Sequence, residues 1–412
     1  MRPDRTPFHE PPLHDPPLHE PPVHGRWDAV VAGARVAGAA TAMLLARQGA
    51  RVLVVDPARP GSDTLSTHAI MRAGVLQLHR WGLLDRVRAA GTPRIEVTSF
   101  HYGSEEISIP IKARDGIDGL YAPRRTVLDP ILVDAAREAG AWVVHGWSAV
   151  GLLGGPPERV RGVRLRSADG STIDVNTRLV IGADGMRSRI ARLVGARTTH
   201  SIPHATATVY GYVPDLGIDA FAWHFGPERG MGTIPTNGGD TCVYAGMRPE
   251  RLLAGREHGL DALFLDTIRS LSPELAERIA ERAASTKLRA FAGAPTFLRE
   301  SWGPGWALVG DAGYFKDPLT AHGITDALRD AELLALAAAE GTDAALAAYE
   351  ARRNELSRGL MDVTGRIASL DWDLGELQNM HRELSRQMQR EVEEILGGRG
   401  FRGARHGVSA TA

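Results

Sequence analysis

The chain contains 412 residues, of which 43% are apolar and 24% are charged, and this balance is typical of a globular protein rather than a disordered one. Its 48 basic and 49 acidic side chains give a formal net charge of −1. Nucleic-acid binders and polybasic membrane proteins need clustered positive charge, so the composition argues against both.

A single cysteine, Cys242, excludes an intramolecular disulfide framework and any cysteine-based zinc or iron–sulfur site. No apolar run is long enough to span a bilayer, and the N-terminus lacks the apolar core of a signal peptide. We therefore expect a cytoplasmic protein with no membrane span. The histidines show no metal-ligand spacing with carboxylates, so we expect no metal site.

Both ends of the chain are expected to lie outside the fold. Residues 1–25 repeat a five-residue unit of the form His-Glu-Pro-Pro-Leu, and its paired prolines prevent both helix and sheet ladders. This Pro/His-rich leader is predicted to be disordered. Residues 397–412 are rich in glycine and arginine, and we expect a disordered tail there.

The folded part begins with a strand, a turn, a helix and a second strand. Residues 28–32 are apolar enough for a buried strand, and residues 39–48 have helical spacing before Gly49. Residues 51–56 form the second apolar strand. A unit of this kind and length is the opening of a dinucleotide-binding half.

Later segments predict further helices and many short strands. Helices are expected at 70–80, 127–140, 188–194, 257–284, 323–340, 343–356 and 372–396, and strands at 94–111, 142–152, 159–166, 171–181, 205–213, 220–224, 230–235, 241–246 and 306–309. The block 205–246 predicts a sheet platform separate from the nucleotide-binding part. The last helix carries one apolar stripe from Leu377 to Ile395, so we expect it to pack on its own chain.

The first motif, Gly33-x-Arg35-x-x-Gly38, lies between the first strand and the first helix. Its glycines permit a tight turn, so the N–H groups of the helix can face a pyrophosphate. Asp56 ends the second strand, where a carboxylate can accept hydrogen bonds from a ribose. Arg35 replaces the usual middle glycine, and its charge could serve the pyrophosphate.

Two further motifs each follow an apolar strand. The second ends in Ala183-Asp184-Gly185, with a helix opening at Ser188, and taken alone it also fits a plain turn with an N-cap. The third is Gly310-Asp311, followed by Pro318 and a helix that begins at Gly323-Ile324. The positive end of that helix suits the electron-rich edge of a redox-active ring.

The order of these three motifs resembles the flavoprotein aromatic hydroxylase superfamily, the p-hydroxybenzoate hydroxylase-like FAD proteins, which also includes geranylgeranyl reductases and flavin-dependent halogenases. The resemblance covers roughly residues 27–345. It implies an α/β fold, with a Rossmann-like FAD-binding domain, an inserted β-sheet substrate domain and C-terminal helices. The implied FAD contacts are Gly33, Arg35, Gly38, Asp56, Arg125, Asp184, Gly185, Gly310, Asp311, Pro318, Gly323 and Ile324.

The resemblance also implies a division of the chain into segments. The FAD-binding domain is expected at 26–95, 123–200 and 301–345, the substrate domain at 96–122 and 201–300, and C-terminal helices at 346–396. The third motif departs from the family's usual Gly-Gln-Gly-x-Asn, because Ala321-His322-Gly323-Ile324-Thr325 stands there. Substrate and redox tuning are therefore not carried over from any named hydroxylase.

Five residues are candidates for chemistry or substrate contact. His68 lies in the loop that the family places near the flavin ring, and His322 precedes the helix at the predicted ring edge, so both are candidate acid–base groups. Each could instead serve only local structure. Trp223 and His224 alternate on one platform strand, so only one of them can face the pocket. Tyr314 could line the pocket or pack in the core.

We expect an FAD-dependent monooxygenase in which NAD(P)H is the transient reductant and O2 oxygenates a small aromatic or apolar organic substrate. The alternative is an FAD-dependent reductase or dehydrogenase of the geranylgeranyl reductase type. A halogenase is disfavoured because the Trp-x-Trp-x-Ile-Pro signature and a matching pocket lysine are missing. A non-enzymatic flavin-binding protein is a third class. The substrate and the choice between NADH and NADPH cannot be read from the sequence, and a homodimer stays an open expectation.

Overall fold

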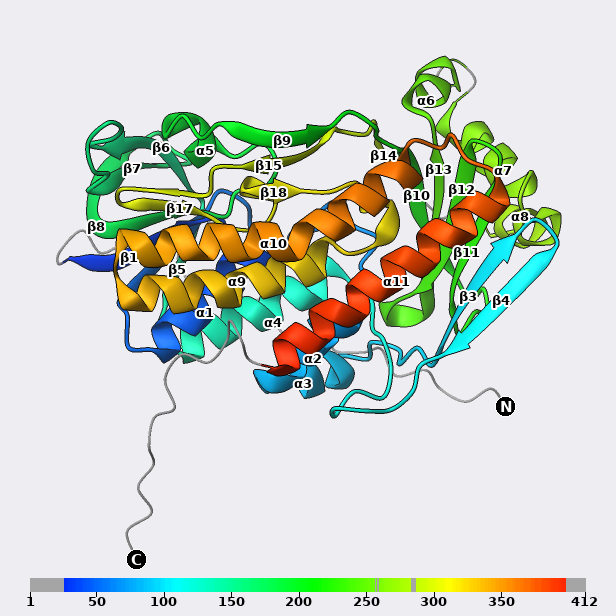
Figure 1. Ribbon diagram of the computed structural model, residues 1–412, viewed down its shortest axis with the longest axis horizontal. Helices are drawn as coiled ribbons and strands as arrows, with labels where there is room; N and C mark the ends of the chain where they lie inside the picture. The colour runs from blue at the N-terminus through cyan, green and yellow to red at the C-terminus, as the bar shows by residue number, and fades with distance from the viewer. Residues whose placement is uncertain (1–25, 256, 258, 283–286, 398–412) are drawn as a thin grey trace, which may run out of the picture.

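The computed structural model describes residues 26–255, 257, 259–282 and 287–397 (Figure 1). The predicted leader and nearly all of the predicted tail lie outside these residues. Within the described chain, every helix is too short or too polar to cross a membrane.

The larger of the two main sheets has eight strands and a parallel centre. Its path runs through β16 (Trp302–Gly303), β17 (Trp306–Leu308), β8 (Thr172–Gly182), β1 (Trp27–Ala32), β2 (Val52–Asp56) and β5 (Trp142–His145). The strands from β17 to β5 are parallel, so their carboxyl ends share one edge. An antiparallel extension is built from β6 (Trp147–Leu153) and β7 (Gly162–Ser167) beside β8.

Side chains alternate along these strands and give the sheet two apolar faces. Val31 and Val54 join the core formed with α1 (Val36–Arg47), α4 (Arg125–Glu138) and α9 (Gly323–Glu340), which pack side by side (Figure 1). Val30 and Val55 join a second core with β7 and α5 (Arg189–Leu193). Burial on both faces explains why β1 and β2 are continuous apolar runs.

The second sheet, which we call the platform, has seven strands. Their order is β14 (Arg289–Phe291), β10 (Ala207–Pro214), β13 (Asp240–Met247), β12 (Arg229–Pro235), β11 (Phe221–Gly226), β3 (Val97–Tyr102) and β4 (Glu105–Pro110). Its outer face packs on α6 (Pro249–Gly255), α7 (Leu260–Arg269) and α8 (Pro273–Ala280). Its inner face is rich in aromatic residues and belongs to the same core as α1 and α9.

Smaller elements connect these layers. They are the helices α2 (Arg72–Arg80) and α3 (Leu84–Ala89), the short turns of helix η1 (Asn237–Gly239), η4 (Gly310–Ala312) and η5 (Pro318–Thr320), and a three-stranded sheet of β18 (Tyr314–Phe315), β15 (Thr296–Arg299) and β9 (Thr198–Ile202). The strands of the small sheet were not predicted, because such short segments carry too little pattern.

The single helix predicted at 257–284 is wrong. The described residues of this range form α7 and α8 instead, because Gly259 has φ +88° and Ser272 caps a new helix whose first residue is Pro273. The helix predicted at 343–356 is longer than expected, since α10 runs over Asp343–Ala368.

The C-terminal helix α11 (Leu374–Gly397) crosses from the platform to α2 and packs on α10 (Figure 1). Its predicted apolar stripe is confirmed, with Leu377, Met380, Leu384 and Ile395 buried and Met388 partly buried. At the platform end, the Tyr102 hydroxyl and His381 Nδ1 share a hydrogen bond of 2.6 Å. The helix is therefore fixed to both parts of the molecule.

The first turn of α1 leaves no space for a methyl group at Gly38. A Cβ there would lie 1.9 Å from the carbonyl oxygen of Gly33, whereas one at Gly155 would meet nothing within 4 Å. We expect Gly38→Ala to lower the free energy of unfolding by about 1–3 kcal/mol through overpacking, and Gly155→Ala to leave it nearly unchanged. Urea titrations of both variants measure the difference, and equal effects would contradict this packing argument.

Candidate functional site

The three sequence motifs meet at the carboxyl edge of the parallel sheet. Gly33 follows β1, Ala183 follows β8 and Gly310 follows β17, and these three strands are neighbours. The Ala183 N–H donates to Ala32 O at 2.8 Å, and the Val309 N–H donates to Gly182 O at 2.9 Å. Segments almost 280 positions apart in sequence thus form one continuous edge, where α/β proteins bind their ligands.

Two glycines allow these loops to touch. Gly33 has φ +111°, and a Cβ on it would lie 2.4 Å from Ala183 O. Gly310 has φ +60°, and a Cβ on it would lie 2.7 Å from Ala37 Cβ. Side chains at either position would separate the loops.

The N-terminus of α1 has the features of an anion site. Its first hydrogen bond runs from the Ala39 N–H to Arg35 O at 2.8 Å. The N–H groups of the helix that precede Ala39 therefore have no acceptor within the helix. No side chain caps this end. Arg35 Nη1 is buried and finds no hydrogen-bond partner among the described residues. A pyrophosphate would supply the missing acceptor and complement the helix dipole.

Asp56 orders the turn that leads into this site. Its Oδ2 accepts a hydrogen bond of 2.8 Å from the Ala34 N–H, and its Oδ1 accepts one of 2.7 Å from the Ala58 N–H. A carboxylate has about four acceptor positions, so it can still receive a ribose hydroxyl.

The Asp184 side chain caps α5. Its oxygens accept hydrogen bonds from Ser188 Oγ at 2.5 Å, the Arg189 N–H at 2.6 Å and the Ile190 N–H at 3.2 Å. These helix donors take up most of its acceptor positions, and the cofactor contact expected of Asp184 stays a prediction. Gly185, with φ +78° and open space around its Cβ position, is the residue of this motif that leaves room.

Asp311 and Gly323 are both exposed, and we call the space that they border the hollow. The Asp311 side chain is exposed, yet burial is the largest cause that raises its pKa to about 6, followed by the charge of Asp326, while Arg125 opposes them. A carboxylate that is open to solvent and yet enclosed by protein indicates an open space within the fold. Gly323 opens the same space, because it is exposed and a Cβ there would meet nothing within 4 Å. Pro318 begins η5 on the way to Gly323, and Ile324 next to it is 8% exposed.

Arg125 connects this hollow to the loop that carries His68. Its guanidinium holds Asp129 through hydrogen bonds of 2.8 and 3.0 Å, and its charge acts on both Asp311 and His68. The predicted cofactor role of Arg125 is compatible with this position.

His68 is buried and has a partner that the sequence did not reveal. Its Nε2 and the Tyr212 hydroxyl share a hydrogen bond of 2.5 Å, and its backbone has φ +68°. Burial, assisted by the charges of Arg125, Arg124 and Arg289, lowers the pKa of His68 to about 3. Tyr212 lies on the inner platform face. The alternation of Tyr210 and Tyr212 in a predicted strand was the sequence signal that could have pointed to this residue.

Charged groups surround this pair on the platform. The Arg124 guanidinium lies over the Tyr212 ring at 3.5 Å from its centre and pairs with Asp240 at 3.2 Å. Arg289 pairs with Asp63 at 3.0 Å and hydrogen-bonds Tyr210. We call Asp63, Arg124, Tyr210, Tyr212, Asp240 and Arg289 the polar roof.

Trp223 and His224 lie on opposite platform faces. Trp223 is buried on the inner face, with its ring 5.1 Å from that of Phe100. His224 lies on the other face, where its ring is stacked on that of His101 with the ring centres 3.9 Å apart. Burial lowers the pKa of His224 to about 4. The expected substrate contact of His224 does not fit this placement, because strand alternation turns its side chain outward.

Tyr314 and His322 lie in a buried ionic cluster beneath α9. Tyr314 is 2% exposed and packs in the core, which is the second of the two placements expected for it. His322 Nε2 contacts Glu391 Oε2 at 2.7 Å, so its side chain is directed to α11. His322, Asp326 and Glu391 are close enough to hold a metal ion, but the Arg329 guanidinium lies 3.0 Å from Asp326 and 2.8 Å from Glu391 and already neutralises them.

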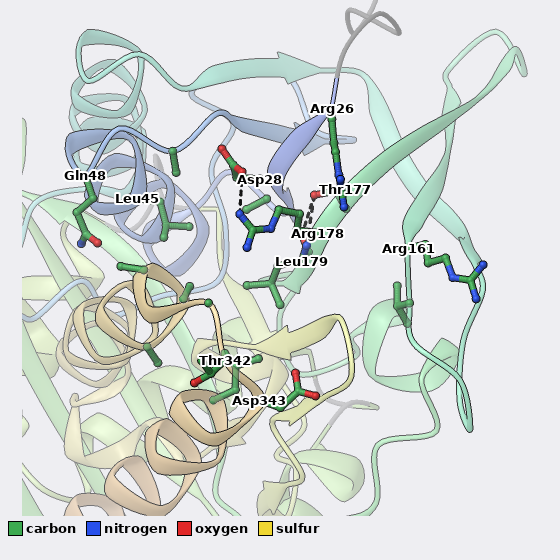
Figure 2. Close-up of a pocket in the computed structure, with 18 of the residues that line it drawn as sticks. Arg26, Asp28, Leu45, Gln48, Arg161, Thr177, Arg178, Leu179, Thr342 and Asp343 are labelled. Atoms are coloured by element: carbon green, nitrogen blue, oxygen red, sulfur yellow. Dashed lines mark hydrogen bonds and ion pairs between the residues drawn. The ribbon is translucent and has the colours of Figure 1, made fainter.

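A separate cavity of about 920 Å³ lies at the opposite, amino-terminal edge of the sheet (Figure 2). Arg26, Asp28 and Arg178 line it, together with the last turns of α1 and α9. The negative ends of these helices explain the arginines there. This cavity contains none of the predicted site residues.

Substitutions of Asp311 and Gly323, which border the hollow, should have different effects. We expect Asp311→Ala to lose bound FAD, because the carboxylate is the polar group exposed within the space, while Asp343→Ala on the surface retains it. Flavin absorbance per protein after gel filtration measures retention. Unchanged flavin content in Asp311→Ala would show that the third motif was misread.

Gly323→Ala should leave the stability of the apoprotein unchanged or slightly raised, because alanine favours helix and its methyl group meets open space. FAD affinity should fall, since that methyl group would enter the volume proposed for the ring. Calorimetry of the apoprotein and fluorescence titration with FAD separate the two effects. Unaltered FAD affinity would place the ring elsewhere.

Comparisons with known proteins agree with this geometry. A family described as FAD binding domain matches residues 26–364. A digeranylgeranylglycerophospholipid reductase from Methanopyrus kandleri is 30% identical over 85% of this chain and 92% of its own. A menaquinone reductase from Mycobacterium tuberculosis is 29% identical over 75% of each chain. The structure of PqsL from Pseudomonas aeruginosa, a probable FAD-dependent monooxygenase, covers 87% of this chain and 100% of its own, with a TM-score of 0.72 and 20% identity.

The identity to PqsL supports only a shared fold, whereas the family match spans most of the chain. The observed helices and strands, the order of the motifs and the strand topology all agree with the family match. The chain belongs to the FAD binding domain family and is an FAD-dependent oxidoreductase.

Proposed function

We propose that the protein is an FAD-dependent monooxygenase that takes electrons from NAD(P)H and inserts one oxygen atom from O2 into a compact, electron-rich aromatic substrate. The observation that carries this proposal is the polar roof with its His68–Tyr212 pair, where the charge of Arg125 acts on both His68 and Asp311.

The residues at the sheet edge fit the cofactor. The α1 N-terminus with Arg35 would hold the pyrophosphate, and Asp56 would hold the ribose. Asp311 would hold the ribityl chain, which leads to the flavin ring. The N-terminus of α9 at Gly323 would face the ring edge. When bound, FAD supplies the redox chemistry by accepting a hydride from NAD(P)H and activating O2.

The His68–Tyr212 pair suits hydrogen bonding to a substrate hydroxyl without a net charge. His68 is neutral at pH 7, since its pKa is about 3, and burial raises the pKa of Tyr212 above its usual range. Tyr212 Oη shares a hydrogen bond of 2.5 Å with His68 Nε2 and can accept another from a substrate hydroxyl. Such a bond would draw the substrate proton partly toward Tyr212, and this would make a phenol ring more electron-rich and more easily oxygenated.

The roof also limits the substrate. Its two arginines are balanced by Asp63 and Asp240, so the surface is polar without a large net charge. A substrate with an aromatic ring and a hydroxyl or carbonyl group matches these donors and acceptors. A long polyisoprenyl chain would cover these groups without offering them hydrogen bonds, and removing polar groups from water in this way is costly.

A reductase is the second candidate, and the curated relatives favour it. Both reductases described above align over three quarters or more of this chain at 29–30% identity. The same FAD edge would serve such an enzyme, with the hydride going to a substrate double bond. The polar roof is the feature of this chain that argues against a long apolar substrate.

Oxygen consumption decides between them. Purified FAD-loaded protein is incubated with NADH or NADPH and a panel of phenols, polyketides and terpenoids under 18O2. We expect substrate-dependent NAD(P)H oxidation, matching O2 uptake and one 18O atom in the product. Substrate-dependent NAD(P)H oxidation that persists without O2 and yields a product with two added hydrogens would establish the reductase instead.

Removing the Tyr212 hydroxyl should slow turnover without releasing the cofactor. We expect Tyr212→Phe to lower kcat by about 10²-fold or more, which is the usual contribution of a positioned acid–base group, with unchanged flavin content. Tyr210→Phe is the matched control on the same strand and face, and its effect should be smaller. Equal kcat values for the two variants would remove Tyr212 from the mechanism.

A further inference from the structure

The platform sheet ends in a strand whose outer side is open. Among the described residues, β4 pairs with β3 and with no other strand, and it forms the outermost strand of the platform (Figure 1). All of its residues are exposed, including Ile107 at 38% and Ile109 at 46%. An edge that presents free backbone groups beside apolar side chains can bind a further strand.

The pairing of β3 with β4 shows which backbone groups point outward. The Ile111 N–H donates to Glu96 O at 2.7 Å, one step beyond the last pair of this antiparallel ladder. Hydrogen-bonded pairs alternate with non-hydrogen-bonded pairs in such a ladder. The odd-numbered residues of β4 therefore bond to β3, and the backbone groups of Glu106, Ser108 and Pro110 point outward.

These outward groups favour one antiparallel register with a second copy of β4. Only outward residues can exchange hydrogen bonds across the new edge, so they must face one another. Aligning Glu106 with its own copy would oppose like charges, and aligning Ser108 with its own copy would place Glu106 opposite Pro110, which has no N–H. Aligning Glu106 with Ser108 avoids both conflicts. By symmetry this pair forms on each side of the two-fold axis, with both N–H groups bonded each time.

The same register brings the exposed isoleucines together. Ile107 would lie opposite Ile107 of the second copy, at a non-hydrogen-bonded position, where side chains approach most closely. Ile109 would lie diagonal to that isoleucine and opposite Glu105. Glu105 keeps its own partner, because its carboxylate accepts a hydrogen bond of 2.7 Å from Gln378 Nε2. The contact would thus remove apolar side chains from water without opposing carboxylates.

We propose that the protein forms a two-fold homodimer in which the β4 strands of two chains pair antiparallel, with Glu106 opposite Ser108 and Ile107 opposite its own copy. The two platforms then form one continuous sheet. The strands β13, β12, β11 and β3 lie between β4 and the roof residues of β10, so this inference does not rest on the proposed monooxygenase activity.

The oligomeric state in solution is the first test. Sedimentation velocity of the full chain over a range of concentrations should show a dimer that dissociates on dilution. Ile107→Lys would place two ammonium groups opposite each other and should raise the dimer Kd by about tenfold or more, because opposed like charges disfavour association. Leu253→Lys, at an exposed leucine of α6, should leave the Kd unchanged. A chain that stays monomeric, or a dimer that Ile107→Lys does not weaken, would overturn the proposal.

Cysteine substitutions test the register. Cys242 is buried and is the only cysteine of the chain, so Ile107→Cys would supply the one accessible thiol. Mild oxidation of this variant should give a covalent dimer, because the two side chains face each other. Ile109→Cys should give none, since its two copies would lie about 13 Å apart along the strands. A disulfide-linked dimer of Ile109→Cys, or none of Ile107→Cys, would contradict the register.

A second variant covers the case in which lysine at position 107 destabilises the platform. The Ser108 N–H points away from β3, so Ser108→Pro removes a hydrogen bond of the dimer and none of the backbone bonds between β3 and β4. It should weaken dimerisation and leave the circular dichroism spectrum unchanged. A folded Ser108→Pro protein with the dimer Kd of the unmodified chain would rule out pairing through β4.

Discussion

Parallel pairing of β17, β8, β1 and β2 is the constraint on which the site depends, because it brings the carboxyl ends of four strands to one edge. The polar groups that follow these strands come from distant positions along the chain. Glycines at the closest approaches, Gly33 and Gly310, let the loops touch. With side chains there, the edge would open and the cofactor contacts would separate.

The platform gives this edge an opposite wall. Its outer face is apolar and packs on helices, while its inner face combines aromatic residues with the polar roof. The His68 loop joins the two sides, through the Tyr212 hydroxyl and through the pairing of Asp63 with Arg289. The strained backbone of His68 at φ +68° is maintained by these contacts.

Side chains of the last described helix link it to the centre of the fold. α11 contacts the platform through His381 and the α9 N-terminus through Glu391, so one helix spans both parts. The ionic cluster beneath α9 is costly to desolvate, and its ion pairs offset part of that cost. Such clusters fix local geometry because any single loss leaves a charge unpaired.

The sequence by itself determined the local elements and the motif edge. Apolar runs and glycine spacing predicted β1, α1 and β2, and the order of three motifs predicted the FAD binding domain family, because these signals lie within short segments. The tertiary structure alone decided where side chains point. It directed Asp184 to a helix cap, Tyr314 and His322 to a buried cluster, and His224 to the outer face, since each placement depends on partners far away in the chain. The partners of Tyr212 and Glu391 were decided in the same way, because their contacts with His68 and His322 cross 144 and 69 positions of the chain.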